Sequence, residues 1–311
     1  MNCLKNIYTK KHSLFIILFL SFAGVSLSQS AQKTKVFILA GQSNMDGRGN
    51  ADLLSKDEFV ALDFAKERIQ FYYKGTVNNM KEPLVIDGPL DVTEPWEFVK
   101  KKFRLNKCFG PELFFGIELS KTYPDQEFLF IKRAQGGTSL YGAWNPEWSF
   151  EKAQMANEEN KRKLFKDLIS TIDTGLKKLS PNSYEIVGML WVQGESDSDT
   201  TISTLPSETY GENLVRLIQK VRKHFNVPEM PFLMLEVGSK KVVDGMRKAI
   251  KKLNDVSLVN RSKNPAANNY TPIYSHNWNG KAVGHYNYEG MKRIGHLFFE
   301  SYQTSYINNL Q

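Results

Sequence analysis

Apolar residues along this 311-residue chain gather in short runs, and a polar or glycine-containing segment follows each run. Short apolar runs bounded in this way are typical of buried strands. Between them lie stretches in which apolar residues recur every three or four positions, as on one face of a helix. The predicted strands are 35–41, 128–131, 186–192, 231–237 and 256–259. One predicted helix begins at 110–112, and the other four cover 150–179, 207–225, 242–253 and 288–302.

This alternation of strands and helices predicts one α/β domain with a parallel sheet. The strand cores are apolar throughout, so we expect helices to cover both faces of the sheet. Segment 46–109 is different, because it mixes Gly, Pro, Asp and residues of both charges. We expect this segment to be irregular, and to be functional or to contain small elements of its own.

The first 28 residues have the layout of a secretory signal peptide. Lysines precede an apolar stretch at 13–26, and small residues follow before Gln29. The apolar stretch is shorter than the roughly 20 residues of a membrane-spanning helix, although an uncleaved signal anchor is the alternative. We predict cleavage after Ser28, a single mature domain of residues 29–311, and no stable membrane insertion after cleavage.

Charge and cysteine content agree with an exported protein. Cleavage would remove three lysines and no acids, so the net charge would fall from +8 to +5. The remaining basic residues are scattered along predicted helices, which is typical of a solvated surface and not of a nucleic-acid interface. Only Cys108 would remain, so the mature chain has no internal disulfide. Secretion without disulfides suggests a bacterial protein, secreted or periplasmic.

Three predicted strands end in polar turns that contain glycine. These turns are GQSNM at 41–45, QGGTS at 135–139 and QGES at 193–196. Because the carboxyl ends of parallel strands meet at one edge of a sheet, the turns can converge. A fourth polar segment, GHYNYEG at 284–290, precedes the last predicted helix. The four segments contain the residue types that ester hydrolysis requires.

An ester hydrolase needs a nucleophile, a base beside it and donors for the oxyanion. Ser43 is the candidate nucleophile, and His285 is the candidate base because imidazole titrates near neutral pH. The candidate oxyanion donors are the backbone N–H groups of Ser43, Gly136 and Gly137 and the side-chain amide of Gln193. His276 is the alternative base.

The four blocks, GQSNM, QGGTSL, WVQGESD and GHYNYEG, resemble the SGNH hydrolase superfamily. Within it they resemble the sialate O-acetylesterase-like group, which includes the family six carbohydrate esterases. The resemblance covers about residues 35–300. It implies a flavodoxin-like, three-layer α/β/α fold. It also implies deacetylation of acetylated oligo- or polysaccharides through an acyl-enzyme, with no metal or other cofactor.

The acid that orients the histidine is where this chain departs from the pattern. Many relatives have Asp three residues before the catalytic His, and this chain has Ala282 there. The resemblance makes Glu195 the expected acid, because related carbohydrate esterases use the Glu of the QGE block. Asp197 is the runner-up, and a Ser–His dyad is a third possibility, since a triad acid adds rate to a reaction that proceeds without it. A non-catalytic carbohydrate-binding protein with the same fold is the alternative function.

Residues beside the motif blocks are candidates for sugar contacts. They are Gln42, Asn44, Arg48, Trp144 and Trp278. Aromatic rings offer flat apolar faces on which sugars can stack, whereas Arg48 could instead pair with Asp46. These loops lack the contiguous apolar surface that a lipase would need. The sugar itself stays open among acetylated xylan, sialic acid, pectin and rhamnogalacturonan.

Overall fold

The computed structural model describes residues 32–75, 84–278, 281–282 and 284–306, so the predicted signal peptide and its cleavage point lie outside it. From Gln32 onward, the described residues form one compact unit. No helix among them is long and apolar enough to cross a membrane. The main strands are β1 (Thr34–Gly41), β3 (Ile69–Gly75), β4 (Leu84–Pro89), β6 (Phe128–Ala134), β7 (Tyr184–Val192), β8 (Phe232–Leu235) and β9 (Val256–Val259).

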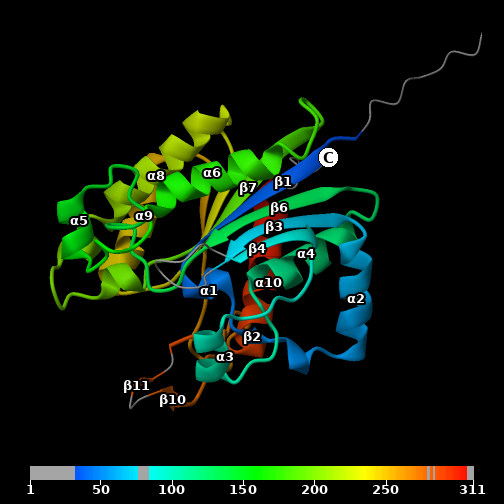
Figure 1. Cartoon of the computed structure of the whole chain (residues 1–311), viewed down its shortest axis with the longest axis horizontal. Coiled ribbons are helices and arrows are strands. Elements are labelled where there is room, and N and C mark those ends of the chain that lie inside the picture. Colours follow the sequence, from blue (N-terminus) through cyan, green and yellow to red (C-terminus); the bar gives the residue numbers. More distant parts are fainter. Residues whose placement is uncertain (1–31, 76–83, 279–280, 283, 307–311) are drawn as a thin grey trace, which may run out of the picture. The chain divides into compact units, whose positions relative to one another are not determined.

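These strands form a seven-stranded sheet in the order β4-β3-β6-β1-β7-β8-β9 (Figure 1). All neighbours are parallel except β3 and β4. Five neighbouring strands of this sheet, β6-β1-β7-β8-β9, have the strand order of a flavodoxin-like doubly wound sheet. In the centre, Gly41 at the end of β1 pairs with Ala134 of β6 and Val192 of β7. The three motif turns therefore leave the sheet from adjacent strand ends.

Helices cover both faces of the sheet, so the predicted three-layer α/β/α architecture is confirmed (Figure 1). On one face α4 packs against α2 and α10, and on the other α8 packs against α9 and α6 lies along β6. Their bounds are α2 (Lys56–Lys66), α4 (Pro111–Thr122), α6 (Leu164–Leu176), α8 (Tyr210–Phe225), α9 (Lys240–Lys252) and α10 (Tyr288–Tyr306). The shorter elements are α1 (Ser43–Asp46), β2 (Gly49–Asn50), η1 (Ala51–Leu53), α3 (Glu97–Phe103), β5 (Cys108–Phe109), α5 (Phe150–Met155), η2 (Ser196–Ser198), α7 (Leu205–Glu208), β10 (Asn277–Trp278) and β11 (Lys281–Ala282).

Segment 46–109 contains elements of its own, as expected, but two of them belong to the main sheet. β3 pairs in parallel with β6, and β4 pairs with β3 in antiparallel fashion at the sheet edge. The expectation of an irregular segment was therefore wrong for these residues. β4 is largely exposed, so its sequence, LVIDGP, lacks the continuous apolar character of a covered strand.

The single helix predicted over 150–179 is also wrong, because the chain breaks it into α5 and α6. Asn157 has a left-handed backbone with φ of 54°. The next residue, Glu158, turns its carboxylate inward, where it accepts hydrogen bonds from the N–H groups of Ser139 and Ala143. These bonds pair backbone N–H groups of the loop after β6, and the break between α5 and α6 places Glu158 where it can accept them.

The turn from β1 into α1 requires glycine at position 41. Gly41 has φ of +151°, and a Cβ atom there would lie 2.1 Å from the carbonyl oxygen of Val192. Only glycine permits this approach without displacing the backbone. The chain can therefore leave the central strand sharply and place Ser43 at the first position of α1.

A buried network of charged and polar groups lies beneath this turn. Lys132 on β6 and Glu112 on α4 pair at 2.7 Å, and their side chains are 0% and 2% exposed. Lys132 also lies 3.1 Å from the carbonyl oxygen of Asp46, to which it donates. The carboxylate of Asp46 accepts from Arg48 at 2.7 Å and from the hydroxyl of Tyr73. The network joins α1 to β3, β6 and α4.

Breaking this network should destabilise the fold strongly. Glu112→Ala leaves Lys132 as an unpaired buried charge, so we expect the free energy of unfolding to fall by about 3–5 kcal/mol. The exposed pair of Lys121 and Glu118 gives a matched control, and Lys121→Ala should cost less than about 1 kcal/mol. Urea unfolding followed by circular dichroism measures both changes. Equal losses for the two variants would contradict this account of the buried pair.

Candidate active site

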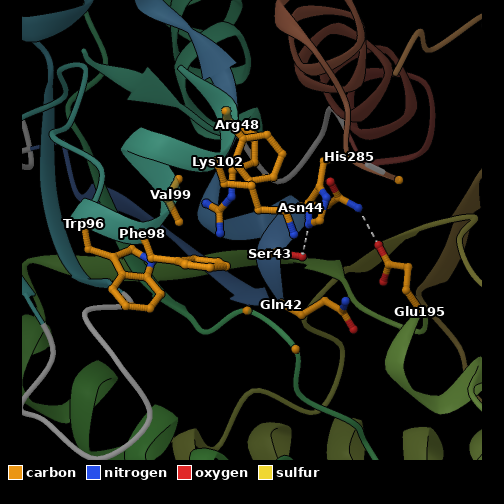
Figure 2. A pocket seen from close by; sticks show the side chains of 14 residues that line it. Gln42, Ser43, Asn44, Arg48, Trp96, Phe98, Val99, Lys102, Glu195 and His285 are labelled. Atoms are coloured by element: carbon orange, nitrogen blue, oxygen red, sulfur yellow. Dashed lines mark hydrogen bonds between the residues drawn. The ribbon is translucent and has the colours of Figure 1, made fainter. Parts of the chain in front are cut away.

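Ser43 and His285 meet at the carboxyl end of β1. The Oγ atom of Ser43 and Nε2 of His285 lie 2.9 Å apart, although 242 positions separate the two residues (Figure 2). The segment with His285 is held in place because the N–H of Tyr274 donates to the carbonyl oxygen of His285. The ring of Phe103 packs edge-on against the imidazole, with centroids 5.0 Å apart. The structure thus joins the residues predicted as nucleophile and base.

The environment of His285 favours its neutral form. Burial, with the nearby positive charges of Arg48 and Lys102, lowers the pKa of His285 from 6.5 to about 3. A neutral imidazole can accept the hydroxyl hydrogen of Ser43 through Nε2. The pair therefore has the protonation state that a general base needs at neutral pH.

Gly136 and Gly137 line the same cavity as Ser43, as their predicted oxyanion role requires. A Cβ atom on Gly136 would come within 3.4 Å of the Ser43 Cβ, so this backbone passes directly beside the nucleophile. Gly137 has φ of +65°, which glycine adopts without strain. The geometry is compatible with oxyanion donors from this loop.

Gln193 does not line the cavity beside Ser43, where its predicted role as an oxyanion donor would place it. Its side-chain nitrogen donates to Asp197 at 2.6 Å and to the carbonyl oxygen of Thr138 at 3.1 Å, with Gln42 at 3.4 Å. The residue is fully buried and does not line the cavity beside Ser43. Because its amide hydrogens are engaged inside the protein, Gln193 joins the motif loops instead of facing a substrate.

Glu195, the predicted acid, bonds to Asn44 and not to His285. Its Oε1 atom accepts from Nδ2 of Asn44 at 2.6 Å (Figure 2). Among the described residues no hydrogen-bond partner reaches the buried Nδ1 atom of His285. Burial raises the pKa of Glu195, partly offset by its bond to Asn44. In the described part of the chain, Glu195 therefore hydrogen-bonds to the residue after the nucleophile and makes no hydrogen bond to the imidazole.

Asp197, the runner-up acid, supports the glycine loop. Its carboxylate accepts from the N–H groups of Leu140 and Tyr141, at 2.7 and 2.9 Å, and from Gln193. Burial raises its pKa to about 7. All these partners belong to the loops that follow β6 and β7, so Asp197 orders these loops and does not orient His285.

The cavity beside Ser43 has a wall that the motifs do not reveal. Its volume is about 460 Å³, and α3 with the residue before it forms one side. Trp96 and Phe98 lie together there, with ring centroids 5.3 Å apart, and extend toward Ser43 (Figure 2). Lys102 of the same helix also lines the cavity. Segment 46–109 carries no recognised motif, so the sequence analysis missed this wall; the aromatic residues Trp96 and Phe98 were the signal that could have indicated it.

The predicted sugar contacts fall into different places. Gln42 and Asn44 line the cavity, as does Arg48, and Arg48 also forms the ion pair with Asp46 that was its alternative. Trp144 was wrongly predicted as a sugar contact: it is 0% exposed, and its indole N–H donates to Thr138. The side chain of Trp278 lies outside the described residues.

Two further observations limit the site. His276, the alternative base, lies 3.3 Å from the carbonyl oxygen of Lys102 through Nε2 and does not contact Ser43. A second cavity of about 490 Å³ lies on the other side of Gln42 and Glu195. Its walls mix polar side chains, such as Lys161 and Asp199, with apolar ones, such as Met155 and Ile202, and they do not include Ser43.

The doubly wound sheet carries a paired serine and histidine at the carboxyl end of β1, an arrangement that suits a serine esterase. Residues 33–304 match the family described as carbohydrate esterase, sialic acid-specific acetylesterase, and the chain therefore belongs to that family.

Individual proteins are similar to this chain over part of the sequence or in fold. A probable carbohydrate esterase from Arabidopsis thaliana is 38% identical over 55 residues, which span 18% of this chain and 20% of that protein. A solved Arabidopsis thaliana structure covers 88% of this chain and 99% of its own, at 20% identity and a TM-score of 0.55. The structure of NanS covers 89% of this chain and 99% of its own, at 15% identity and a TM-score of 0.57. The structure of a carbohydrate acetylesterase from Xanthomonas citri covers 88% of this chain and 56% of its own, at 14% identity and a TM-score of 0.54. At these identities the solved structures show likeness of fold.

The low pKa of His285 predicts the pH dependence of esterase activity. Because the imidazole stays neutral well below pH 6.5, kcat/KM on p-nitrophenyl acetate should stay level from pH 7 down to about pH 5. Lys102→Gln removes a nearby positive charge, so the acidic limb should move to higher pH. Lys101→Gln, on the exposed side of the same helix, should leave the limb in place. A wild-type limb centred near pH 6.5 would contradict the prediction.

Proposed function

We propose that this carbohydrate esterase removes O-acetyl groups from sugars through an acetyl-Ser43 intermediate. Ser43 Oγ forms a bond to the acetyl carbon while His285 Nε2 takes the hydroxyl proton. When the ester C–O bond breaks, His285 returns this proton to the departing sugar oxygen. Water, deprotonated by His285, then attacks the acetyl carbon; the bond to Ser43 Oγ breaks, His285 returns the proton to this oxygen, and acetate is released. The 2.9 Å contact between Ser43 and His285 is the observation that carries this proposal.

The proposed machinery is a Ser–His dyad in which Glu195 acts as a positioning residue. No hydrogen bond to a described residue orients the imidazole through Nδ1. Glu195 instead fixes Asn44, whose backbone follows that of Ser43. Such a dyad can work because oxyanion donors and substrate binding account for much of the acceleration in serine hydrolases. Backbone N–H groups of Ser43 and of the Gly136–Gly137 loop are the proposed donors.

The proposed substrate is an acetylated oligo- or polysaccharide outside the cytoplasm. Two cavities share Gln42 and Glu195: one contains Ser43 and the aromatic wall, and the other has mixed polar and apolar walls. Together they can hold sugar units on both sides of Gln42 and Glu195, since aromatic faces stack on sugar rings and polar groups bind their hydroxyls. The signal-peptide pattern of residues 1–28 supports secretion or export to the periplasm.

Acetate release tests the proposed chemistry. Wild-type protein should release acetate from p-nitrophenyl acetate and from an acetylated sugar. Ser43→Ala and His285→Ala should each lower kcat by about 10³-fold or more, because they remove the nucleophile or its base. Mass spectrometry of rapidly quenched protein should find an added acetyl group on Ser43.

Full activity in Ser43→Ala would exclude the proposed mechanism. Glycan binding by a wild-type protein that releases no acetate at any pH would favour the alternative, a non-catalytic carbohydrate-binding protein.

Two substitutions at Glu195 separate a positioning role from that of a triad acid. Glu195→Gln keeps an oxygen that can accept from Asn44, so kcat should fall by less than about 10-fold. Glu195→Ala leaves Asn44 without this partner, and kcat should fall by about 10- to 100-fold. Asn44→Ala should give a similar loss, and the double variant should add little to it. If Glu195→Gln costs as much as Glu195→Ala, the charge itself acts in catalysis.

A further inference from the structure

Two adjacent glycines form the part of the loop after β6 that lies beside Ser43. A Cβ atom on Gly136 would come within 3.4 Å of the Ser43 Cβ, and Gly137 has φ of +65°. Because glycine has no Cβ atom, the peptide planes around it rotate at little energetic cost. Oxyanion donors are effective only when they are held in place before the negative charge develops. A glycine pair in this position therefore needs contacts that fix it.

The residues on both sides of the glycine pair are fixed by hydrogen bonds. The hydroxyl of Thr138, which follows the pair, donates to the carbonyl oxygen of Gln135, which precedes it, at 2.7 Å. The next residue, Ser139, donates its N–H to the carboxylate of Glu158 at 2.7 Å. These bonds hold the two ends of the pair, and the peptide planes between them need a partner of their own.

Lys161 is that partner. Its ammonium group donates to the carbonyl oxygen of Gly137, and no other side chain of the described residues donates to this oxygen. The same ammonium lies 3.3 Å from Oε1 of Glu158, an ion pair that keeps the lysine in place. Both residues lie where the chain passes from α5 to α6. The break between these helices thus supplies two contacts to the glycine loop.

The position of Lys161 also connects the glycine loop with the second cavity. Lys161 lines that cavity, and its side chain is 18% exposed, whereas the side chain of Glu158 is 1% exposed. Gly137 is a wall of both the second cavity and the one that contains Ser43. Lys161 does not line the cavity of Ser43, so any effect that it has on the reaction passes through the loop.

We propose that Lys161 is a positioning residue, which fixes the peptide after Gly137 and thereby the N–H groups of the glycine pair. A hydrogen bond from an ammonium group is roughly twice as strong as one between neutral groups, so a single contact can hold a peptide that glycine leaves free to rotate. The inference rests on the proposed function, in which these N–H groups stabilise the oxyanion.

Replacement of Lys161 by methionine tests this role, because methionine keeps most of the apolar stem and lacks the ammonium group. Loss of an oxyanion donor lowers kcat by about 10²- to 10³-fold, and a loosened donor should cost less. Lys161→Met should therefore lower kcat on p-nitrophenyl acetate about 10-fold, with KM changed less than about 2-fold. Lys161→Arg keeps the charge and can donate to the same oxygen, so it should recover most of the rate.

A transition-state analogue distinguishes this role from a loss of stability. Ser43 Oγ can add to the boron of phenylboronic acid, and the tetrahedral anion that forms places an oxygen where the oxyanion would lie. Its inhibition constant should rise about 10-fold in Lys161→Met, in parallel with the fall of kcat/KM. A variant that only folded less completely would contain fewer active molecules with an unchanged inhibition constant.

Two controls isolate the contact with Gly137. The ammonium of Lys152 also donates to a backbone carbonyl oxygen, that of Glu147 at 3.0 Å, and lines neither cavity, so Lys152→Met should leave kcat and the inhibition constant unchanged. Lys161→Met should also be measured in a Glu158→Gln background, where no buried carboxylate is left without its cation. The 10-fold loss should persist there, and this double variant decides the question if Lys161→Met alone does not fold.

The outcomes separate this inference from the proposed function. An inhibition constant that stays unchanged in Lys161→Met would overturn the positioning role, and so would a loss that disappears in the Glu158→Gln background. In both cases the esterase stands if wild-type activity still depends on Ser43. If hydrolysis persists in Ser43→Ala, the proposed function fails, and this inference fails with it.

Discussion

The buried carboxylate of Asp46 holds the nucleophile turn in its position. It accepts hydrogen bonds from Arg48 and Tyr73, and the carbonyl oxygen of the same residue accepts from Lys132. Lys132 is compensated in turn by Glu112. Charges at this depth are costly unless each one is paired and hydrogen-bonded. The four-residue helix α1 is therefore fixed to the sheet, through β3 and β6, and to helix α4, although it is too short to be stable alone.

The same charges act on the chemistry in two opposing ways. Arg48 and Lys102 keep His285 neutral, which prepares it to accept a proton. They also oppose the imidazolium that forms during reaction, and no carboxylate of the described residues bonds to Nδ1 to offset this. A tetrahedral intermediate, however, carries a negative oxygen, which nearby cations stabilise in a site of low dielectric constant. The positive charges near Ser43 thus destabilise the imidazolium form of His285 and stabilise the oxyanion of the intermediate.

The sequence predicted the central part of the fold because its strands are covered on both faces. Continuous apolar runs identified β1, β6 and β7, and the turns after them placed Ser43 and the glycine loop correctly at one edge. Edge strand β4 is exposed and lacks such a run, so it was missed. The resemblance to known esterases paired His285 with Ser43 across the chain.

Side-chain partners were harder to predict than positions. A glutamate two residues beyond Gln193 can turn toward several neighbours, and only the folded loops show that it bonds to Asn44. Gln193 and Trp144 were predicted to face the substrate, yet both are buried, and both donate to Thr138. The wall at Trp96 and Phe98 comes from a segment without a motif, so its place beside Ser43 depended on the fold.

Segment 46–109 combines two structural features that bear on how such a site can evolve. It begins and ends beside the nucleophile turn, adds β3 and β4 to one edge of the five-stranded core, and carries α3 to the cavity. Ser43 and His285 both lie outside it. The same segment also contains Asp46, Arg48 and Tyr73, which hold the nucleophile turn. An exchange confined to Trp96–Val99 would replace the wall that faces the sugar while keeping both the reacting pair and the contacts of Asp46.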